Sequence, residues 1–237
     1  MKILHSVLGV FVGVSMLVFL LITAFEIGAY SDFGWYEKAY QKYDVMTDLQ
    51  MEMKDVMDVT EEMMAYLRGN RSDLDVETVV DGVEREFFND REKAHMEDVQ
   101  KLFIGGLWIR RGAGVLLVFA AVLLIITKAK WQKLIPQSIL ISMGSFIGVT
   151  LAAGVLFMSD FTKYFTIFHE IFFDNDLWLL DPSTDLLIRM LPEGFFLDMV
   201  LRIGMAFLVM MFLTLIISIM MLMWSKIRKT NKTIKIY

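Results

Sequence analysis

The sequence predicts an all-α integral membrane protein whose four transmembrane helices carry an extracytoplasmic helical cap and interfacial helices. Hydrophobic residues make up 56% of the 237 residues, and the mean hydropathy is +0.54. This composition is too apolar for an ordinary soluble domain. The apolar residues also gather into four uncharged stretches, which cover residues 3–25, 112–127, 134–159 and 203–225. Three of these stretches exceed the roughly 20 residues that a helix needs to cross a bilayer.

The second stretch predicts a spanning helix although it is shorter than the others. An apolar segment, residues 102–109, precedes it, and only Arg110 and Arg111 lie between the two. Arginine side chains near a helix end can extend to the lipid headgroups, so they do not prevent insertion. Pairing with carboxylates of the outer loops is the alternative role for these arginines and for Arg202. We expect one membrane domain, residues 1–237, with spans at about 5–28, 104–127, 135–158 and 200–224.

The first and third stretches each raise a further question. A cleaved signal peptide is the alternative for the first stretch. Its apolar length is too great for a typical signal, and no small-residue cleavage site precedes Tyr30, so we expect a retained helix. The third stretch contains Gly144, Gly148 and Gly154, small residues that allow helices to pack closely.

The positions of the charges predict the orientation in the membrane. Basic residues precede the first stretch, lie between the second and third, and follow the fourth: Lys2, Lys128, Lys130, Lys133, Lys226, Arg228, Lys229, Lys232 and Lys235. By the positive-inside rule, both termini are cytoplasmic in a plasma membrane, and residues 30–103 and 159–199 are extracytoplasmic. Residues 31–100 carry 19 acidic and 8 basic residues, and residues 160–198 carry 8 and 2. The basic tail is explained by this topology and requires no nucleic acid.

The two outer segments predict a helical cap with helices at the membrane surface. Apolar residues recur at helical spacing from 44 to 67, and acidic residues fill the other face. After a break at Gly69, Asp73 or Asp75 is a candidate cap for a short following helix. The aromatic run at 161–173 predicts a helix lying in the interface. Asp181 followed by Pro182 then indicates the start of another helix.

A further helix is predicted over residues 83–103, and it carries His95. Arg91 and Asp98 share its face with His95, and Asp98, one turn away, is placed to hold the imidazole or raise its pKa. The pair Gly105 and Gly106 follows. We expect a bend at these glycines that lays the helix along the interface and brings His95 to the level of the lipid.

His95 and His169 are the candidate catalytic residues. The chain has three histidines and no cysteine, which excludes a thiol nucleophile and a thiolate metal site. His5 is expected at the inner surface, so only the other two can share a site. Three chemistries stay open for them. They are an acid–base or nucleophilic pair, a zinc site that needs a third ligand such as Asp98 or Asp176, and a pH-sensing pair.

Two segments of the sequence carry a resemblance to a known family. The first is R-E-x-x-H-M-x-D-V, from Arg91 to Val99. The second is F-H-x-I-F-F-x-N-D-x-W-L-L-D-P-x-T-D-L-L-I-R-x-L-P-E-G-F-F, from Phe168 to Phe196. Both resemble the lipoprotein intramolecular transacylase family of Gram-positive bacteria. The similarity extends to the four-helix layout, but only these two segments are specific.

The resemblance implies an O-to-N acyltransferase that makes lyso-form lipoproteins. The sn-2 acyl chain of a diacylglyceryl-cysteine lipoprotein would move to the amine of that cysteine, with His95 and His169 as catalytic residues and no cofactor or metal. The partners it implies are the diacylated lipoprotein and membrane lipids. The chemistry of the neighbouring residues adds Arg91, Asn175 and Trp178 as candidates for oxyanion contact or substrate positioning, and Asp98 and Asp176 as candidates to orient the histidines.

Two other classes of function are compatible with the residues. One is a non-enzymatic membrane sensor or assembly protein with structural histidines, in which replacing either histidine by alanine would leave function intact. The other is a metal-dependent membrane hydrolase, which chelators would inactivate. No third ligand at an evident spacing supports the metal site.

Overall fold

The four predicted apolar stretches lie in four long helices of the computed structural model, which describes residues 1–234. These helices are α1 (Lys2–Tyr30), α5 (Asp90–Ile126), α6 (Trp131–Ser159) and α9 (Glu193–Ile234). Each contains a segment long and apolar enough to cross a membrane. Lys235, which the orientation argument uses, lies outside the described residues, and the side chains of Phe157 and residues 228–234 are not described.

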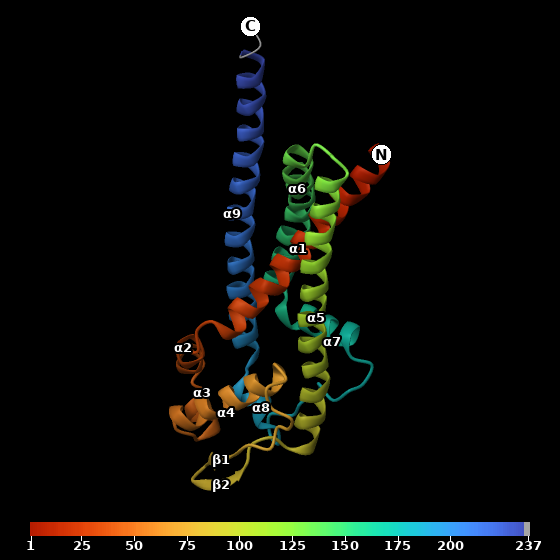
Figure 1. The fold of residues 1–237 in the computed structure, drawn as a ribbon. Helices are drawn as coiled ribbons and strands as arrows, with labels where there is room; N and C mark the ends of the chain where they lie inside the picture. Colours follow the sequence, from red (N-terminus) through yellow and green to blue (C-terminus); the bar gives the residue numbers. More distant parts are fainter. Residues whose placement is uncertain (235–237) are drawn as a thin grey trace. The chain divides into compact units, whose positions relative to one another are not determined.

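The chain divides into two compact units, whose helices and strands are labelled in Figure 1. The membrane unit comprises residues 1–25, 108–155 and the described part of the segment that begins at 204. The histidine unit comprises residues 26–107 and 156–203, and it holds both candidate catalytic histidines. Residues 90–101 of α5 belong to the histidine unit and are rich in charge, so they lie outside the apolar part of the helix that can span the membrane.

Within the membrane unit, α1 and α6 pack closely at small residues other than those predicted. A Cβ atom added to Gly13 would lie 2.1 Å from the hydroxyl of Ser142, and one added to Gly9 would lie 2.5 Å from that of Ser138. Gly144, Gly148 and Gly154 lie in open space instead, because a Cβ there would meet no described atom within 4 Å. The prediction of close packing at these three glycines was therefore wrong. The serines and glycines nearer the start of α6 and α1 make that contact.

The histidine unit contains five shorter helices and one hairpin. The helices are α2 (Gly34–Lys42), α3 (Val45–Leu49), α4 (Met53–Leu67), α7 (Phe161–Phe172) and α8 (Leu186–Met190). Aromatic and aliphatic side chains form the core, including Tyr36, Tyr40, Val56, Val59, Phe87, Phe88 and Met190. The predicted helix over 44–67 is two helices, because Gln50 adopts a left-handed conformation with φ of 54° that ends the first. The segment from Asp181 closes a turn, so the predicted helix there begins only at Leu186.

A small antiparallel hairpin replaces the short helix predicted after Asp73 or Asp75. Strands β1 (Glu77–Val80) and β2 (Val83–Glu86) pair with Val80 opposite Val83. The two-residue turn is Asp81–Gly82, with φ of 52° and 71°. Aspartate followed by glycine favours such a turn, and the β-branched residues before it favour a strand. The same hairpin shortens the predicted helix over 83–103, which begins at Asp90.

The start of α5 is fixed by a reciprocal cap. The side chain of Asn89 accepts a hydrogen bond from the backbone N–H of Glu92 at 3.0 Å, and the Glu92 carboxylate accepts one from the N–H of Asn89 at 2.8 Å. This arrangement is a capping box. Glu92 is fully buried, and its second carboxylate oxygen accepts from the N–H of Leu187 in α8 at 2.6 Å. One carboxylate therefore joins the start of α5 to α8.

The bend predicted at Gly105 and Gly106 is absent. Helix α5 includes both glycines without interruption over its 37 residues. A glycine inside a helix costs about 1 kcal/mol relative to alanine, which lowers helical stability but does not end a helix flanked by strong helix formers on both sides. Good helix formers such as Leu102 and Leu107 surround the pair, so the local preference for a break is overridden.

We expect the capping box to contribute measurably to stability. Replacing Glu92 by alanine removes one half of the cap and leaves the Leu187 N–H without its acceptor, so unfolding should become easier by about 1–3 kcal/mol. Thermal unfolding in detergent checks this. The matched control is Glu97→Gln, because Glu97 lies on an exposed face of the same helix and forms an exposed ion pair with Lys101. Equal midpoints for the two variants would contradict the assigned role of Glu92.

Candidate active site

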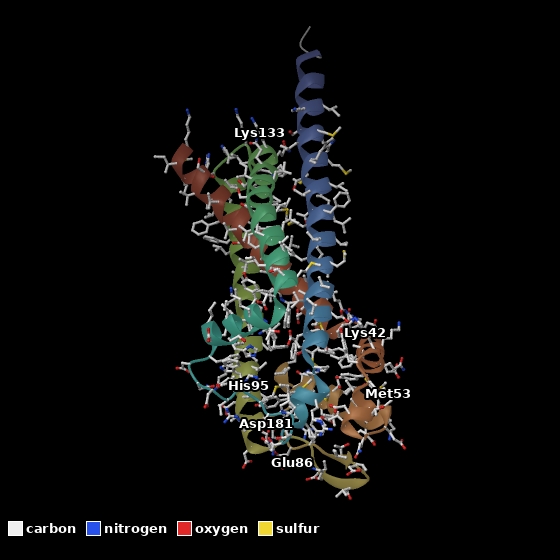
Figure 2. All side chains as sticks on the ribbon, turned by 180° about the vertical axis from the view of Figure 1, so that it is seen from behind. Lys42, Met53, Glu86, His95, Lys133 and Asp181 are labelled. Atoms are coloured by element: carbon white, nitrogen blue, oxygen red, sulfur yellow. The ribbon has the colours of Figure 1, made fainter. Side chains whose placement is uncertain are left out.

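The fold brings the two predicted histidines together. His95 projects from α5 (Figure 2) and His169 from α7, and their ring centroids lie 6.1 Å apart. Both residues belong to the histidine unit, and each is only 7% exposed. Two imidazoles at this separation can act on the same bound molecule.

The ring of His169 has a defined tautomer. Its Nδ1 lies 2.7 Å from the backbone carbonyl oxygen of Phe165, one turn earlier in α7. A carbonyl oxygen only accepts hydrogen bonds, so Nδ1 carries the hydrogen of the neutral ring. The lone pair of Nε2 is therefore the basic position. Burial lowers the pKa of His169, and the hydrogen bond to Phe165 acts in the opposite direction.

His95 has a more strongly depressed pKa and an unsatisfied nitrogen. Its Nδ1 is buried and has no hydrogen-bond partner within the described part of the chain. Burial, and secondly the neighbouring His169, lowers the pKa of His95 to about 4, while the Asp98 carboxylate acts in the opposite direction. The ring is therefore neutral at pH 7. A buried polar atom without a partner is costly unless a ligand satisfies it.

Aromatic rings surround the pair. The indole of Trp178 stacks on His169 with the centroids 4.9 Å apart. Phe165 and Phe168, both in α7, meet the same imidazole edge-on at 4.4 and 5.4 Å. Phe173 lies within 5.6 Å of both histidines. Such surroundings exclude water and strengthen electrostatic interactions with a bound substrate. The sequence showed this aromatic run, but only Trp178 was predicted as a site residue, since the phenylalanines fit a lipid-facing helix equally well.

The remaining predicted site residues connect the segment after α7 to α5. Asp98 accepts a hydrogen bond from the side-chain amide of Asn175 at 2.9 Å. Arg91 donates to the backbone carbonyl of Asp176 and lies 3.6 Å from its carboxylate. The indole N–H of Trp178 donates to the carbonyl of Asn175 at 2.9 Å.

The two aspartates predicted to orient the histidines make these contacts instead. The Asp98 carboxylate binds Asn175 and Lys101, and Asp176 binds Arg91. Among the described residues, no group of three or more His, Asp or Glu side chains is placed to hold a metal ion. The zinc hypothesis therefore has no third ligand in this part of the chain.

Comparison with known proteins agrees with the helical membrane fold. The family model described as "Lipoprotein intramolecular transacylase Lit" matches residues 10–196. The in meso structure of the membrane integral lipoprotein intramolecular transacylase Lit from Bacillus cereus has a TM-score of 0.75 at 17% identity, over 96% of this chain and 100% of that one. A variant of that protein with a histidine replaced by alanine gives a TM-score of 0.72 at 17% identity, over 94% and 96% of the two chains. No curated protein matches.

The fold and the paired histidines define a multi-pass membrane protein with a buried imidazole site. The matched region covers most of the sequence, and the chain belongs to the lipoprotein intramolecular transacylase family. The predictions of the fold class and of the family are thereby confirmed.

We expect the imidazole of His95 to be neutral at mildly acidic pH. A histidine with an ordinary pKa of about 6.5 is roughly three-quarters protonated at pH 6. Because burial lowers the pKa of His95 to about 4, this ring should remain mostly neutral there, and the pKa of His169 should lie below its usual range. Titration of ¹⁵N-histidine-labelled protein by NMR checks this, with His95→Ala and His169→Ala for assignment. His95 signals that titrate near pH 6.5 would contradict the buried arrangement.

Proposed function

We propose that this protein transfers the sn-2 acyl chain of a diacylglyceryl-cysteine lipoprotein to the α-amine of the same cysteine. The product is an N-acyl, S-monoacylglyceryl lipoprotein, the lyso form. The observation that carries the proposal is the close pair of neutral, buried imidazoles in a chain of the transacylase family. The partners are the diacylated lipoprotein and membrane lipids, and no nucleic acid is involved.

The reaction requires that the amine and the ester be held close together and that one proton move between them. The amine nitrogen attacks the ester carbonyl carbon, the new C–N bond forms, and the bond from that carbon to the glycerol oxygen breaks. One proton passes from the nitrogen to the glycerol oxygen, so the mass of the lipoprotein does not change. Ester and amine belong to one molecule, and holding them together converts the step into a favourable intramolecular reaction.

The two histidines are suited to two different roles in this reaction, one at the amine and one at the oxygen. Nε2 of His169 carries a free lone pair, because Nδ1 is engaged by Phe165, and it takes the proton of the attacking amine. His169 then returns this proton to the leaving glycerol oxygen, while the N–H of the neutral His95 donates a hydrogen bond that stabilises the developing charge on oxygen. The aromatic rings around the pair keep water from competing with the amine.

The site faces the extracytoplasmic side in this proposal, with both termini in the cytoplasm. The support is the distribution of charge, since the segments that form the histidine unit are acidic and the connections at the other ends of the long helices are basic. A lipoprotein anchored in the outer leaflet presents its ester and its amine on this side.

This topology is testable because the chain has no cysteine. We expect a membrane-impermeant maleimide to label Glu61→Cys on intact cells and to label Lys130→Cys only after the cells are permeabilised. Glu61 lies in α4 and Lys130 in the connection between α5 and α6, and both are exposed. The reverse pattern would show that the orientation is inverted.

The activity is tested with a purified model lipoprotein and mass spectrometry of its N-terminal peptide. The wild-type protein should yield N-acyl, S-monoacylglyceryl peptide of unchanged total mass. Loss of a general acid or base reduces rates by about 10²–10⁴-fold, so His95→Ala and His169→Ala should each lose activity by that order. The matched control is His5→Ala, which removes the third histidine from the other unit and should retain the wild-type rate.

The other outcomes distinguish the rival functions. Acyl positions that stay unchanged with the wild-type protein would contradict the proposal and favour a sensor or assembly protein. Release of free fatty acid would identify a hydrolase, and its loss on chelation would identify a metal-dependent one.

A further inference from the structure

Both candidate catalytic imidazoles are largely covered by neighbouring side chains. His95 and His169 are each 7% exposed. An acid or base must come within about 2.6–3.2 Å of the atom that it serves, directly or through one water molecule. The exposed part of the ring is much smaller than an acyl ester with its chain, so a group that now covers the ring has to move before the ester can pack against His169.

Among the ring neighbours of His169, Trp178 is the one that lies in a segment without helix or strand. Phe165 and Phe168 belong to α7 itself, and His95 belongs to α5. Phe173 directly follows the last residue of α7, and its N–H donates to the carbonyl of His169. Trp178 lies in the segment between α7 and α8, which forms only bends and turns, and its indole stacks on the imidazole at 4.9 Å.

Polar contacts near the surface hold the segment around Trp178 against α5. The side chain of Asn175 donates to Asp98, and its backbone carbonyl accepts from the indole of Trp178. The neighbouring Asp176 binds Arg91. Hydrogen bonds and ion pairs at exposed positions each contribute about 0–1.5 kcal/mol, so these polar contacts add little to the cost of moving the indole off the imidazole.

We propose that residues 174–178 form a lid, and that the space filled by the Trp178 ring is where the substrate's ester binds. The hydrogen bond between Asp98 and Asn175 is the latch of this lid. Opening moves the indole off His169 and leaves a site bordered by the aromatic rings of α7, which suits an acyl ester with its chain. The identity of the ligand rests on the proposed function. The existence of the lid does not, because it can be measured without any substrate.

The first test measures access to His169 without any substrate. Diethyl pyrocarbonate acylates neutral, accessible imidazoles, and peptide mass mapping reports the rate at each histidine. Asn175→Ala removes the latch and should raise the rate at His169 at least 5-fold over the wild-type protein. The control is Asp174→Asn, an exposed position in the same segment, which should leave the rate unchanged. Equal rates for Asn175→Ala and the wild type would overturn the lid.

The second test locks the latch in a chain that has no other cysteine. The variant carries Asp98→Cys with Asn175→Cys, joined by oxidation or by a short thiol-specific cross-linker and verified by intact mass. We expect the cross-linked form to lose transacylation at least 10-fold relative to the same protein after reduction. The control pair is Val79→Cys with Glu84→Cys, which face each other across the hairpin and should keep full activity in both states.

The outcomes separate the lid from the proposed function. A cross-linked latch that retains the reduced rate would overturn the lid while leaving the transacylase intact. Wild-type protein that fails to shift the acyl chain would contradict the function, and the rate of His169 modification would still decide whether the lid exists.

Discussion

The buried carboxylate of Glu92 is the interaction on which the arrangement of the site depends. It caps α5 through the N–H of Asn89 and, with its other oxygen, accepts the N–H of Leu187 in α8. His95 follows Glu92 by three residues on the same helix, and α8 ends the segment that begins with α7 and His169. Asn89 adds a second link by donating to the buried Asp185 at 2.8 Å. This polar centre joins the helix that carries His95 to α8, which follows α7 and His169 in the chain.

The chemistry of the pair follows from its burial. Desolvation lowers the pKa of both imidazoles, so both are neutral where an amine must be deprotonated. The carbonyl of Phe165 determines which nitrogen of His169 is basic, and this is a property of the helix, since the bond joins residues four apart in α7. The same aromatic cover also restricts access to the rings, and this is the basis for the lid proposed at Trp178.

The parts of this structure that follow from local pattern could be predicted from sequence. Four long apolar runs predict four helices, and the aromatic run at 161–173 predicts α7. The chemistry of the residues and the family motifs predict that His95 and His169 share a site. Their ring centroids lie 6.1 Å apart. The hairpin was missed, although Asp81–Gly82 is a strong turn signal, because the acidic residues around it resemble the helices on either side. The Asn89–Glu92 capping box is also a local pattern, since an asparagine followed three residues later by a glutamate favours it, but the predicted helix started before it.

Other features depend on tertiary contacts that no local pattern contains. The pair Gly105–Gly106 predicts a break, yet the helix continues because its neighbours favour it. Asp98 lies one turn from His95 and was expected to bind it. Its carboxylate binds Asn175 instead, which belongs to a segment that only the fold brings near. Likewise, the glycines of α6 that were expected to pack against a helix face open space, whereas Ser142 meets Gly13.

The central claim is that His95 and His169 form one catalytic unit, and a double-mutant cycle tests it most directly. Initial rates of acyl transfer would be measured for the wild type, His95→Ala, His169→Ala and the double variant. Residues that act as a unit are strongly non-additive, so the double variant should be about as slow as the slower single variant. If the two losses multiply in the double variant, the histidines act independently, and the account of a shared site is contradicted.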